Sequence, residues 1–305
     1  LYEGIDVGQG PVGLITYMRT DSVHLSKLAL HDAKNIIVEK FGTEYGLNRA
    51  RVYKNKVKNA QEAHEAIRPT DLSRTPESLT SRLSEDLLSL YKLIWNRCVA
   101  SQMAQSVWDT QTIMIASKDG KDQFKATGSV LVFPGYLKVL NETRQEMLLP
   151  SLEINEALSL QELKPQQHFT QPPPRYTEAS LIKTLEGYGI GRPSTYAGIL
   201  KTLRDRDYVR LIRKAFFPQE IGMIVSKLLV EHFSTYVDYN FTAQLEEKLD
   251  KIANDKMQWK PFLRDFWKNF SPLVAKKEKD ISRNDILTEE TDETCPECGK
   301  PLVIR

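Results

Sequence analysis

Hydrophobic residues recur at helical spacing in two segments of the first third of the chain. Apolar positions three and four residues apart predict a helix over 26–41, which Gly42 is expected to end. A wider apolar stripe predicts a second helix over 84–103 with a broad buried face. Cys98 lies on this stripe, and we interpret it as a core thiol rather than a reactive one.

The pattern changes from helical spacing to alternation after this second helix. The segments 107–117, 123–140 and 157–163 alternate apolar and polar positions, which is typical of strands. Pairs containing Gly or Pro mark the turns between them. This part of the chain is therefore predicted to be β-rich, and none of its residues carries chemistry that the sequence identifies.

Helical patterns return after three consecutive prolines, which form a stiff linker. Two helices are predicted, over 177–188 and 193–206, with a glycine turn between them. Thr177 is the expected N-cap of the first helix, and Ser180 is the alternative. A short hairpin over 208–218 follows, and the order of helix, turn, helix and hairpin is typical of a winged-helix domain.

The last part of the chain is predicted to contain two further helices, a linker and half of a metal site. One helix begins at Phe241, and another covers 257–275, where we interpret the aromatic residues as core rather than as a platform for bases. The charged segment 276–293 is expected to be a linker. Cys295 and Cys298 form one Cys-x-x-Cys half of a zinc ribbon, whose second half would lie beyond the chain. A redox pair is the rival interpretation, but no thioredoxin-like pattern surrounds it.

Composition places the chain among ordinary globular proteins. Its 305 residues suggest about two domains, and hydrophobic and charged contents of 41% and 27% are unremarkable. No apolar run approaches the ~18 residues of a membrane span. Three cysteines do not make a disulfide framework, so we expect a cytoplasmic protein. The chain does not begin with Met and is expected to be a piece of a longer protein.

Charge is informative in its distribution rather than in its total. The formal net charge of +2 is too small to indicate a nucleic-acid partner. Between Arg175 and Lys214, however, nine Lys and Arg residues face four acidic residues. Such a basic segment is typical of a phosphate-binding surface, although charge alone indicates a solvated helical face equally well.

The first candidate for chemistry is Tyr17, which follows the apolar pair Leu14–Ile15. Polar side chains surround it in the sequence, namely Thr16, Arg19, Thr20, Asp21 and Ser22. A phenol with a reference pKa of about 10 needs a neighbour that stabilises the phenolate or the phosphate it attacks. Arg19 shares a face with Tyr17 only if this segment is extended. From the residues alone, a tyrosine beside Ile and Met is most often a strand aromatic.

Two further groups of side chains suit phosphate binding. His64 and Arg68 are four residues apart, so on a helix they would share a face and meet one phosphate, with Pro69 ending that helix. A lone histidine near a helix end is nevertheless more often structural. Ser194 and Thr195 stand beside Arg192 where the second helix of the winged-helix pattern begins. Free N–H groups, hydroxyls and a guanidinium make that helix start a phosphate cradle.

Three stretches of the sequence resemble the motifs of type IA DNA topoisomerases. Ile-Thr-Tyr-Met-Arg-Thr-Asp-Ser at 15–22 resembles the active-site motif, and Ala-His-Glu-Ala-Ile-Arg-Pro within 61–70 resembles the second. Gly-Ile-Gly-Arg-Pro-Ser-Thr-Tyr-Ala, within 189–208, resembles the third and most specific motif. The resemblance implies that Tyr17 is the nucleophile that forms a 5′-phosphotyrosine bond and that Arg19 supports it. It implies DNA-binding roles for His64, Arg68, Arg192, Ser194, Thr195 and Arg206.

The resemblance also implies an α+β multidomain fold. Four parts are expected: a helical domain with the catalytic tyrosine (1–104), a β-rich arch or hinge domain (105–172), a helical winged-helix-like DNA-binding domain (173–280), and a linker with the first half of a zinc ribbon (281–305). The family commonly has Gly where this chain has Asp207. Because Asp tolerates left-handed backbone, the turn there is expected to survive.

The implied activity is an ATP-independent isomerase that cuts one strand, passes another and religates, which relaxes negative supercoils. Its partner would be a single-stranded region of negatively supercoiled DNA, bound by a nucleoid-associated monomer. Mg²⁺ would be held by an N-terminal domain that does not precede Leu1, so this chain alone is expected to be inactive. Zn²⁺ would bind the ribbon. The alternative is a winged-helix DNA-binding module without catalysis, which does not account for the surroundings of Tyr17.

Overall fold

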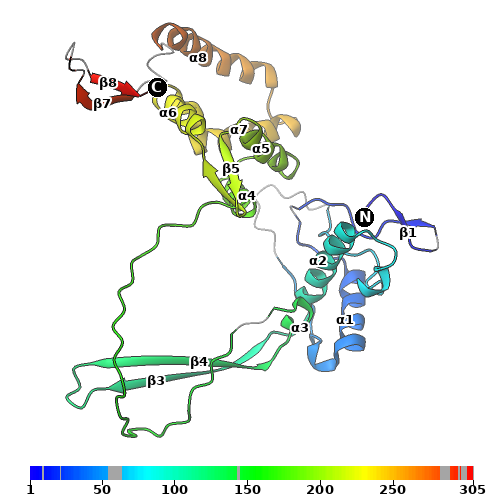
Figure 1. Ribbon diagram of the computed structural model, residues 1–305. Helices are drawn as coiled ribbons and strands as arrows, with labels where there is room; N and C mark the ends of the chain where they lie inside the picture. The colour runs from blue at the N-terminus through cyan, green and yellow to red at the C-terminus, as the bar shows by residue number, and fades with distance from the viewer. Residues whose placement is uncertain are drawn as a thin grey trace. The chain divides into compact units, whose positions relative to one another are not determined.

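The computed structural model divides the chain into two compact units, Leu1–Gln167 and His168–Arg305 (Figure 1). The structure describes residues 1–8, 10–20, 22–53, 64–142, 145–281, 289–294, 296 and 301–304. Over these ranges, no helix combines the length and the apolar character needed to cross a bilayer. Each unit carries one group of the predicted site residues.

Two helices organise the first unit, as the apolar spacing predicted (Figure 1). Helix α1 covers Lys27–Phe41 and helix α2 covers Glu85–Ser101. The hydroxyl of Ser26 caps α1 by accepting a hydrogen bond from the Ala29 N–H at 3.3 Å. Gly42, with φ of 111°, ends α1 in a conformation that glycine adopts readily. Short 3₁₀ turns, Thr43–Tyr45 (η1) and Glu77–Leu79 (η2), complete the helical part.

The core of this unit lies between the two helices and the loop before α2. Tyr91 and Trp95 of α2 are buried, and each donates a hydrogen bond to a loop carbonyl, at Arg74 (2.7 Å) and Leu72 (3.0 Å) respectively. Burial raises the pKa of the Cys98 thiol to about 11. The interpretation of Cys98 as a core thiol is confirmed.

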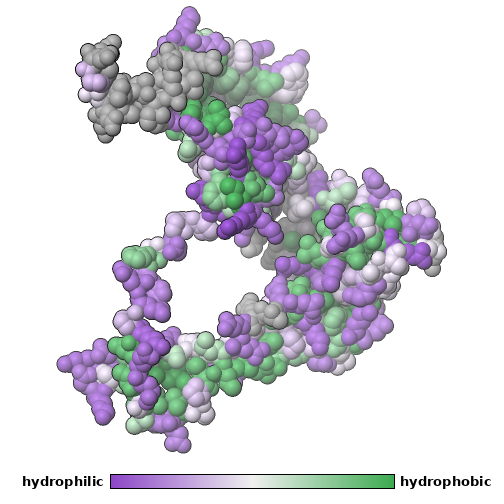
Figure 2. Space-filling model, in the orientation of Figure 1, coloured by the Kyte–Doolittle hydropathy of each residue, from purple (hydrophilic) through white to green (hydrophobic). Residues whose placement is uncertain are grey.

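A long two-stranded ribbon extends from this core. Strands β3 (Val107–Ala116) and β4 (Gln123–Phe133) pair antiparallel, as predicted. Figure 2 shows hydrophobic side chains exposed along this hairpin, because two strands without a covering layer cannot bury their apolar residues. Among them are Val107, Met114, Phe124 and Val132.

Two strand predictions in this region are wrong. The end of 123–140 forms a short helix, α3 (Leu137–Leu140), after the Pro134–Gly135 turn. The segment 157–163 belongs to no strand, and its Leu160 side chain is 75% exposed. Alternation indicates which face a strand would present, but a strand forms only where another edge is available for pairing.

A small hairpin precedes Tyr17. Strand β1 (Ile5–Asp6) pairs with β2 (Pro11–Val12). The Asp6 carboxylate accepts hydrogen bonds from the N–H groups of Gly8 (2.8 Å) and Gly10 (3.2 Å). The glycines let the backbone turn around this carboxylate, since both have positive φ.

The second unit begins with the predicted helix, turn, helix and hairpin. Helix α4 (Glu178–Tyr188) is followed by α5 (Pro193–Asp205), and β5 (Val209–Ile212) pairs with β6 (Ala215–Pro218). The Thr177 hydroxyl caps α4, and the Ser180 hydroxyl in turn accepts a hydrogen bond from the Thr177 N–H. Asp207 has φ of 53°, so the expected left-handed turn after α5 is confirmed.

Three longer helices complete this unit: α6 (Glu220–Val237), α7 (Tyr239–Ala253) and α8 (Trp259–Asp280). The Tyr236 ring of α6 contacts Phe266 and Phe270 of α8, at centroid distances of 5.8 and 4.9 Å. The core interpretation is therefore confirmed for these aromatic residues. It is wrong for Trp259 and Trp267, which are 52% and 62% exposed.

The end of the chain departs from the expected linker. Helix α8 continues to Asp280, and β7 (Glu289–Thr294) pairs antiparallel with β8 (Pro301–Ile304). The prediction of a linker over 276–293 is wrong at both ends, because its first residues continue α8 and its last residues belong to β7. A helix can carry charged residues on its solvent-facing side. Cys295 and Cys298 lie outside the described residues, and the half zinc site stays a prediction.

Candidate catalytic and nucleic-acid site

Two motifs about fifty residues apart in the sequence lie side by side through backbone pairing. The Thr16 N–H donates to the Arg68 carbonyl at 2.9 Å, and the Thr70 N–H donates to the Leu14 carbonyl at 3.0 Å. Ile15 and Pro69 form the bridge between these bonds. The motif around Tyr17 and the motif around His64 therefore belong to one local structure.

Tyr17 is an exposed side chain on a fixed backbone. Leu14 and Ile15 are 1% and 6% exposed and anchor the segment in the core, whereas Tyr17 is 52% exposed. Its ring contacts Tyr2 edge-on at a centroid distance of 5.5 Å and His64 at 5.8 Å. About half of this side chain is therefore open, and among the described residues Tyr2 and His64 flank its ring.

His64 contributes a buried polar atom next to this phenol. Its Nδ1 atom is buried and has no hydrogen-bond partner among the residues that the structure describes. Buried nitrogens of this kind are normally paired. Among the described residues, none therefore binds this nitrogen of the imidazole, whose ring lies beside Tyr17.

The segment that carries Arg19 turns just after Tyr17. The Arg19 N–H donates to the Tyr17 carbonyl at 2.9 Å, which closes a three-residue turn. The backbone between Tyr17 and Arg19 is therefore a turn rather than an extended strand, so the two side chains do not share a strand face. Ser22 is buried and accepts a hydrogen bond from the His24 N–H, whereas Asp21 lies outside the described residues.

Arg68 is held inside the protein by a carboxylate that sequence reasoning missed. Glu65 accepts two hydrogen bonds from its guanidinium, at 2.8 and 3.0 Å, and a third from the Ser26 N–H at 2.7 Å. Burial raises the pKa of Glu65, but the hydrogen bonds from Arg68 and Ser26 outweigh it, so the pKa lies below the ordinary value. The Arg68 side chain is 15% exposed.

The helix on which His64 and Arg68 would share a face does not form. Residues 64–70 form no helix, because their backbone pairs with the Tyr17 segment and Pro69 cannot donate a helical hydrogen bond. His64 faces Tyr17 while Arg68 binds Glu65, so the two do not share a helical face. Because this backbone is not helical, the spacing of three residues between Glu65 and Arg68 was no signal for the ion pair.

The second group of site residues stands at the start of α5 in the other unit. Pro193 occupies the first helical position, and the exposed side chains of Ser194 and Thr195 follow it. The Thr195 hydroxyl accepts from the Arg192 N–H at 2.8 Å and donates to the Arg192 carbonyl at 3.0 Å. The predicted grouping at the helix start is therefore present, with the Thr195 hydroxyl engaged by the backbone.

The Arg192 guanidinium is bound by two acidic residues of α7. Its Nη2 atom is 2.6 Å from Asp250 Oδ2, and its Nη1 atom is 3.5 Å from Glu246 Oε2. Sequence reasoning identified the amphipathic character of this helix but not these contacts. The spacing of four residues between Glu246 and Asp250 places both on one helical face, which is the signal that was available.

Arg206 lies at the opposite end of α5. It is exposed, and its guanidinium carbon is 6.0 Å from the centroid of the Tyr208 ring. With a rise of ~1.5 Å per residue, Arg192 and Arg206 are roughly 20 Å apart along the helix. Two residues so far apart cannot contact one and the same small anion.

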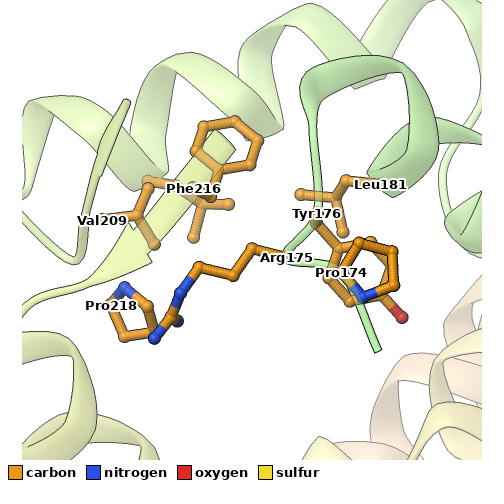
Figure 3. A pocket seen from close by; sticks show the side chains of 8 residues that line it. Pro174, Arg175, Tyr176, Leu181, Val209, Phe216 and Pro218 are labelled. Atoms are coloured by element: carbon orange, nitrogen blue, oxygen red, sulfur yellow. The ribbon is translucent and has the colours of Figure 1, made fainter. Parts of the chain in front are cut away.

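Two pockets adjoin α5 and share Leu203. The first has a volume of about 340 Å³ (Figure 3), and Arg175 crosses it with its guanidinium 4.6 Å from the Phe217 ring centroid. The second, of about 550 Å³, follows the helix itself. It is lined by Ser194, Thr195, Gly198, Ile199, Thr202 and Leu203. Open space therefore extends along α5 from the predicted cradle.

Comparison with known proteins shows that all three motifs lie within the match to one protein family. A family model for DNA topoisomerase matches residues 1–264. The DNA topoisomerase 1 of Rickettsia felis is 50% identical over 277 residues, covering 89% of this chain and 36% of the relative. That of Campylobacter jejuni is 43% identical over 305 residues, covering 100% of this chain and 43% of the relative. Full-length topoisomerase I from Thermotoga maritima matches 99% of this chain and 48% of its own, with a TM-score of 0.75 and 38% identity. The chain thus spans less than half the length of these proteins.

Proposed function

Since the chain belongs to the DNA topoisomerase family, whose model matches residues 1–264, we propose that it carries the strand-cleaving tyrosine of a type IA enzyme. The whole protein would cut one strand of a single-stranded region in negatively supercoiled DNA, pass a strand and religate. The observation that carries this proposal is the exposed Tyr17 phenol, held on a paired backbone beside His64.

In the proposed reaction, the Tyr17 Oη atom attacks the phosphorus of a phosphodiester. A bond from phosphorus to the tyrosine oxygen forms, and the bond to the 3′ oxygen breaks. The phenol loses its proton and the departing 3′ oxygen gains one, which leaves a 5′-phosphotyrosine and a free 3′-hydroxyl. The 3′-hydroxyl later reverses the step. Because one phosphoester replaces another, no nucleotide is consumed.

We assign supporting roles in the first unit by the contacts of each side chain. Arg19 and His64 would stabilise negative charge on the attacked phosphate, since both belong to the segments beside the phenol. Arg68 would act through structure, because its guanidinium is held by Glu65 and by the Pro69 carbonyl. Through Glu65 it would fix the second motif to the start of α1 rather than bind DNA directly.

In the second unit, the start of α5 would bind phosphates of the single strand. Arg192, Ser194 and Thr195 would hold one phosphate, where the helix dipole and exposed hydroxyls favour an anion. Arg206 would hold another, because it lies at the far end of the helix. Binding through several phosphates makes the affinity strongly dependent on salt.

The metals implied by the resemblance would be held elsewhere. Within the ranges that the structure describes, no three His, Cys, Asp or Glu side chains are grouped as a metal site requires. Mg²⁺ would be bound by a domain outside this chain, where it would assist the phosphoryl transfer. The 305-residue chain alone is expected to bind single-stranded DNA without relaxing supercoils. Relaxation by this chain alone would contradict that expectation.

The proposal is tested by trapping the covalent intermediate. The full-length protein, with Mg²⁺ and a 3′-labelled single-stranded oligonucleotide, is quenched with detergent, and label attached to protein is measured. We expect an adduct in the wild type and none in Tyr17→Phe, which keeps the ring contacts but lacks the nucleophilic oxygen. Binding of the oligonucleotide should be nearly unchanged. An adduct in Tyr17→Phe would place the nucleophile at another residue.

A winged-helix DNA-binding module without catalysis is the second candidate. The order of α4, α5, β5 and β6 fits such a module as well, but the match of the DNA topoisomerase model to residues 1–264 does not favour it. Such a module would prefer duplex DNA, because it reads base edges in the major groove. Competition between single- and double-stranded oligonucleotides of equal length separates the two candidates. Preference for the duplex, together with no adduct, would favour the second.

A further inference from the structure

Two carboxylates on α7 hold the guanidinium at the start of α5. We propose that Glu246 and Asp250 are positioning residues that orient Arg192 toward a DNA phosphate. This inference rests on the proposed function of the helix start. Both acidic residues lie in the part of the chain that the family model matches but outside the three motifs, and their contacts with Arg192 arise from the packing of α7 against the loop before α5.

Glu246 holds both the backbone and the side chain at this point. Its Oε1 atom accepts a hydrogen bond from the Gly191 N–H at 3.2 Å, and its Oε2 atom is 3.5 Å from Arg192 Nη1. Gly191 has φ of 78°, and a Cβ there would lie 2.9 Å from the Tyr196 ring. The turn into α5 is therefore close-packed, and the carboxylate locks its N–H group in place.

Asp250 fixes the far side of the guanidinium. Its Oδ2 atom accepts a hydrogen bond from Arg192 Nη2 at 2.6 Å, while Nη1 donates to the Gly191 carbonyl at 2.7 Å. The planar guanidinium is thus bound at both Nη atoms. Its orientation is set before a ligand arrives, which reduces the loss of conformational freedom on binding.

Stability alone is a weak explanation for this arrangement. The side chains of Arg192, Glu246 and Asp250 are 31%, 24% and 38% exposed. Ion pairs that are partly open to solvent contribute little to folding. The same position, however, adjoins the exposed Ser194 and Thr195 side chains and the open space along α5. An arginine oriented there is placed for a phosphate that binds the helix start.

The two carboxylates could affect DNA binding through their charge or through the orientation of Arg192, and these two effects change the affinity in opposite directions. Two carboxylates and one guanidinium leave the group with a negative net charge. If they acted only through charge, removing one would increase the affinity for a phosphate. If they position Arg192, removing one would decrease it, because the guanidinium would no longer be held beside the helix start. The sign of the change separates the two.

The test measures binding of a fluorescent single-stranded oligonucleotide to the full-length protein by anisotropy. Asp250→Asn is compared with Arg192→Gln, with the double variant, and with Glu247→Gln as the matched control. Glu247 is exposed on the same helix, so this control removes the same charge. We expect Asp250→Asn to weaken binding roughly five- to tenfold and Glu247→Gln to leave it unchanged or slightly tighter.

The double variant separates positioning from a general loss of structure. If Asp250 acts through Arg192, Asp250→Asn should have no further effect in the Arg192→Gln background. Both single variants should also lower the salt dependence of log K by about 0.7, the loss of one phosphate contact on a single strand. Glu246→Gln, which retains a carbonyl acceptor for the Gly191 N–H, should weaken binding less than Asp250→Asn.

Tighter binding by Asp250→Asn, or an equal effect with and without Arg192, would overturn the inference. Equal weakening by Glu247→Gln would do the same. If the wild-type protein does not bind the single strand at all, the proposed function fails instead. A thermal unfolding curve for each variant identifies one that has lost its fold, in which case Glu246→Gln decides the outcome.

Discussion

Glu65 illustrates how a single residue supports the site without joining its chemistry. Its carboxylate binds the Arg68 guanidinium through both oxygens and accepts a hydrogen bond from the Ser26 N–H. Ser26 caps α1, and Arg68 donates its N–H to the Thr16 hydroxyl beside Tyr17. One carboxylate therefore connects the start of α1, the second motif and the segment of the candidate nucleophile.

Glu65→Gln should lower the free energy of unfolding by about 1–2 kcal/mol at neutral pH, because a charge-assisted pair becomes a neutral contact. The pKa of Glu65 is lowered in the folded state, so its contribution is present above the ordinary carboxyl pKa and is lost as pH falls through the lowered value. Urea unfolding at pH 7 and near pH 3 measures the difference, which should shrink in acid.

A charge-matched control distinguishes this pair from a general effect of charge. Glu39 is an exposed residue of α1, and Glu39→Gln should change stability little at either pH. A cost of Glu65→Gln that stays the same from pH 7 to pH 3 would mean that the ionised carboxylate is not what stabilises this part of the fold.

At the scale of elements, the packing of the helices requires glycine at one helical position but not at another. A Cβ on Gly222, in α6, would lie 2.3 Å from the Tyr208 carbonyl oxygen. A Cβ on Gly198, in α5, would meet nothing within 4 Å. The first glycine lets α6 approach the backbone before the hairpin, whereas the fold makes no such demand on the second.

Alanine at these two positions should therefore act in opposite directions. Gly222→Ala should destabilise the protein by about 1–3 kcal/mol, because helix and backbone must separate. Gly198→Ala should stabilise it by about 0.5–1 kcal/mol, because alanine is the better helix former. Thermal unfolding of the two variants under one set of conditions is the measurement. A stabilising Gly222→Ala would show that α6 does not pack so closely.

At the scale of the whole molecule, the two units are joined by a chain without regular structure. No residue from 151 to 176 belongs to a helix or an extended strand. Several of its large apolar side chains are exposed, including Leu160, Leu163 and Phe169. Each unit has its own packed elements, so the connection is the part of the fold with the fewest contacts to lose.

Limited chymotrypsin digestion should cut this connection first and release two resistant fragments, because proteases select exposed, irregular backbone. Trypsin should spare residues 151–174, since Lys164 is the only Lys or Arg among them and precedes Pro165. Gel electrophoresis and N-terminal sequencing of the fragments identify the cut. First cuts within α2 or α7, or loss of the whole chain without intermediates, would contradict the division into two units.

Local features of the sequence were sufficient for most helices and for the identity of the candidate nucleophile. The helices α1, α2, α4 and α5 were predicted because helical hydrogen bonds join residues four apart, so apolar spacing and caps are visible in the sequence. Tyr17 stood out because its neighbours match a known motif. The left-handed turn at Asp207 was also a local prediction.

Only the tertiary structure decided which distant residues act together. The Tyr17 and His64 segments pair although they are distant in the sequence, and Arg192 likewise binds acidic residues of the distant α7. Glu65 binds Arg68 within one segment, but on a backbone that is not helical. The missing strand at 157–163 has the same cause, because its apolar pattern found no edge to pair with. Such contacts depend on which segments meet in space, and the spacing of residues along one segment carries no record of that.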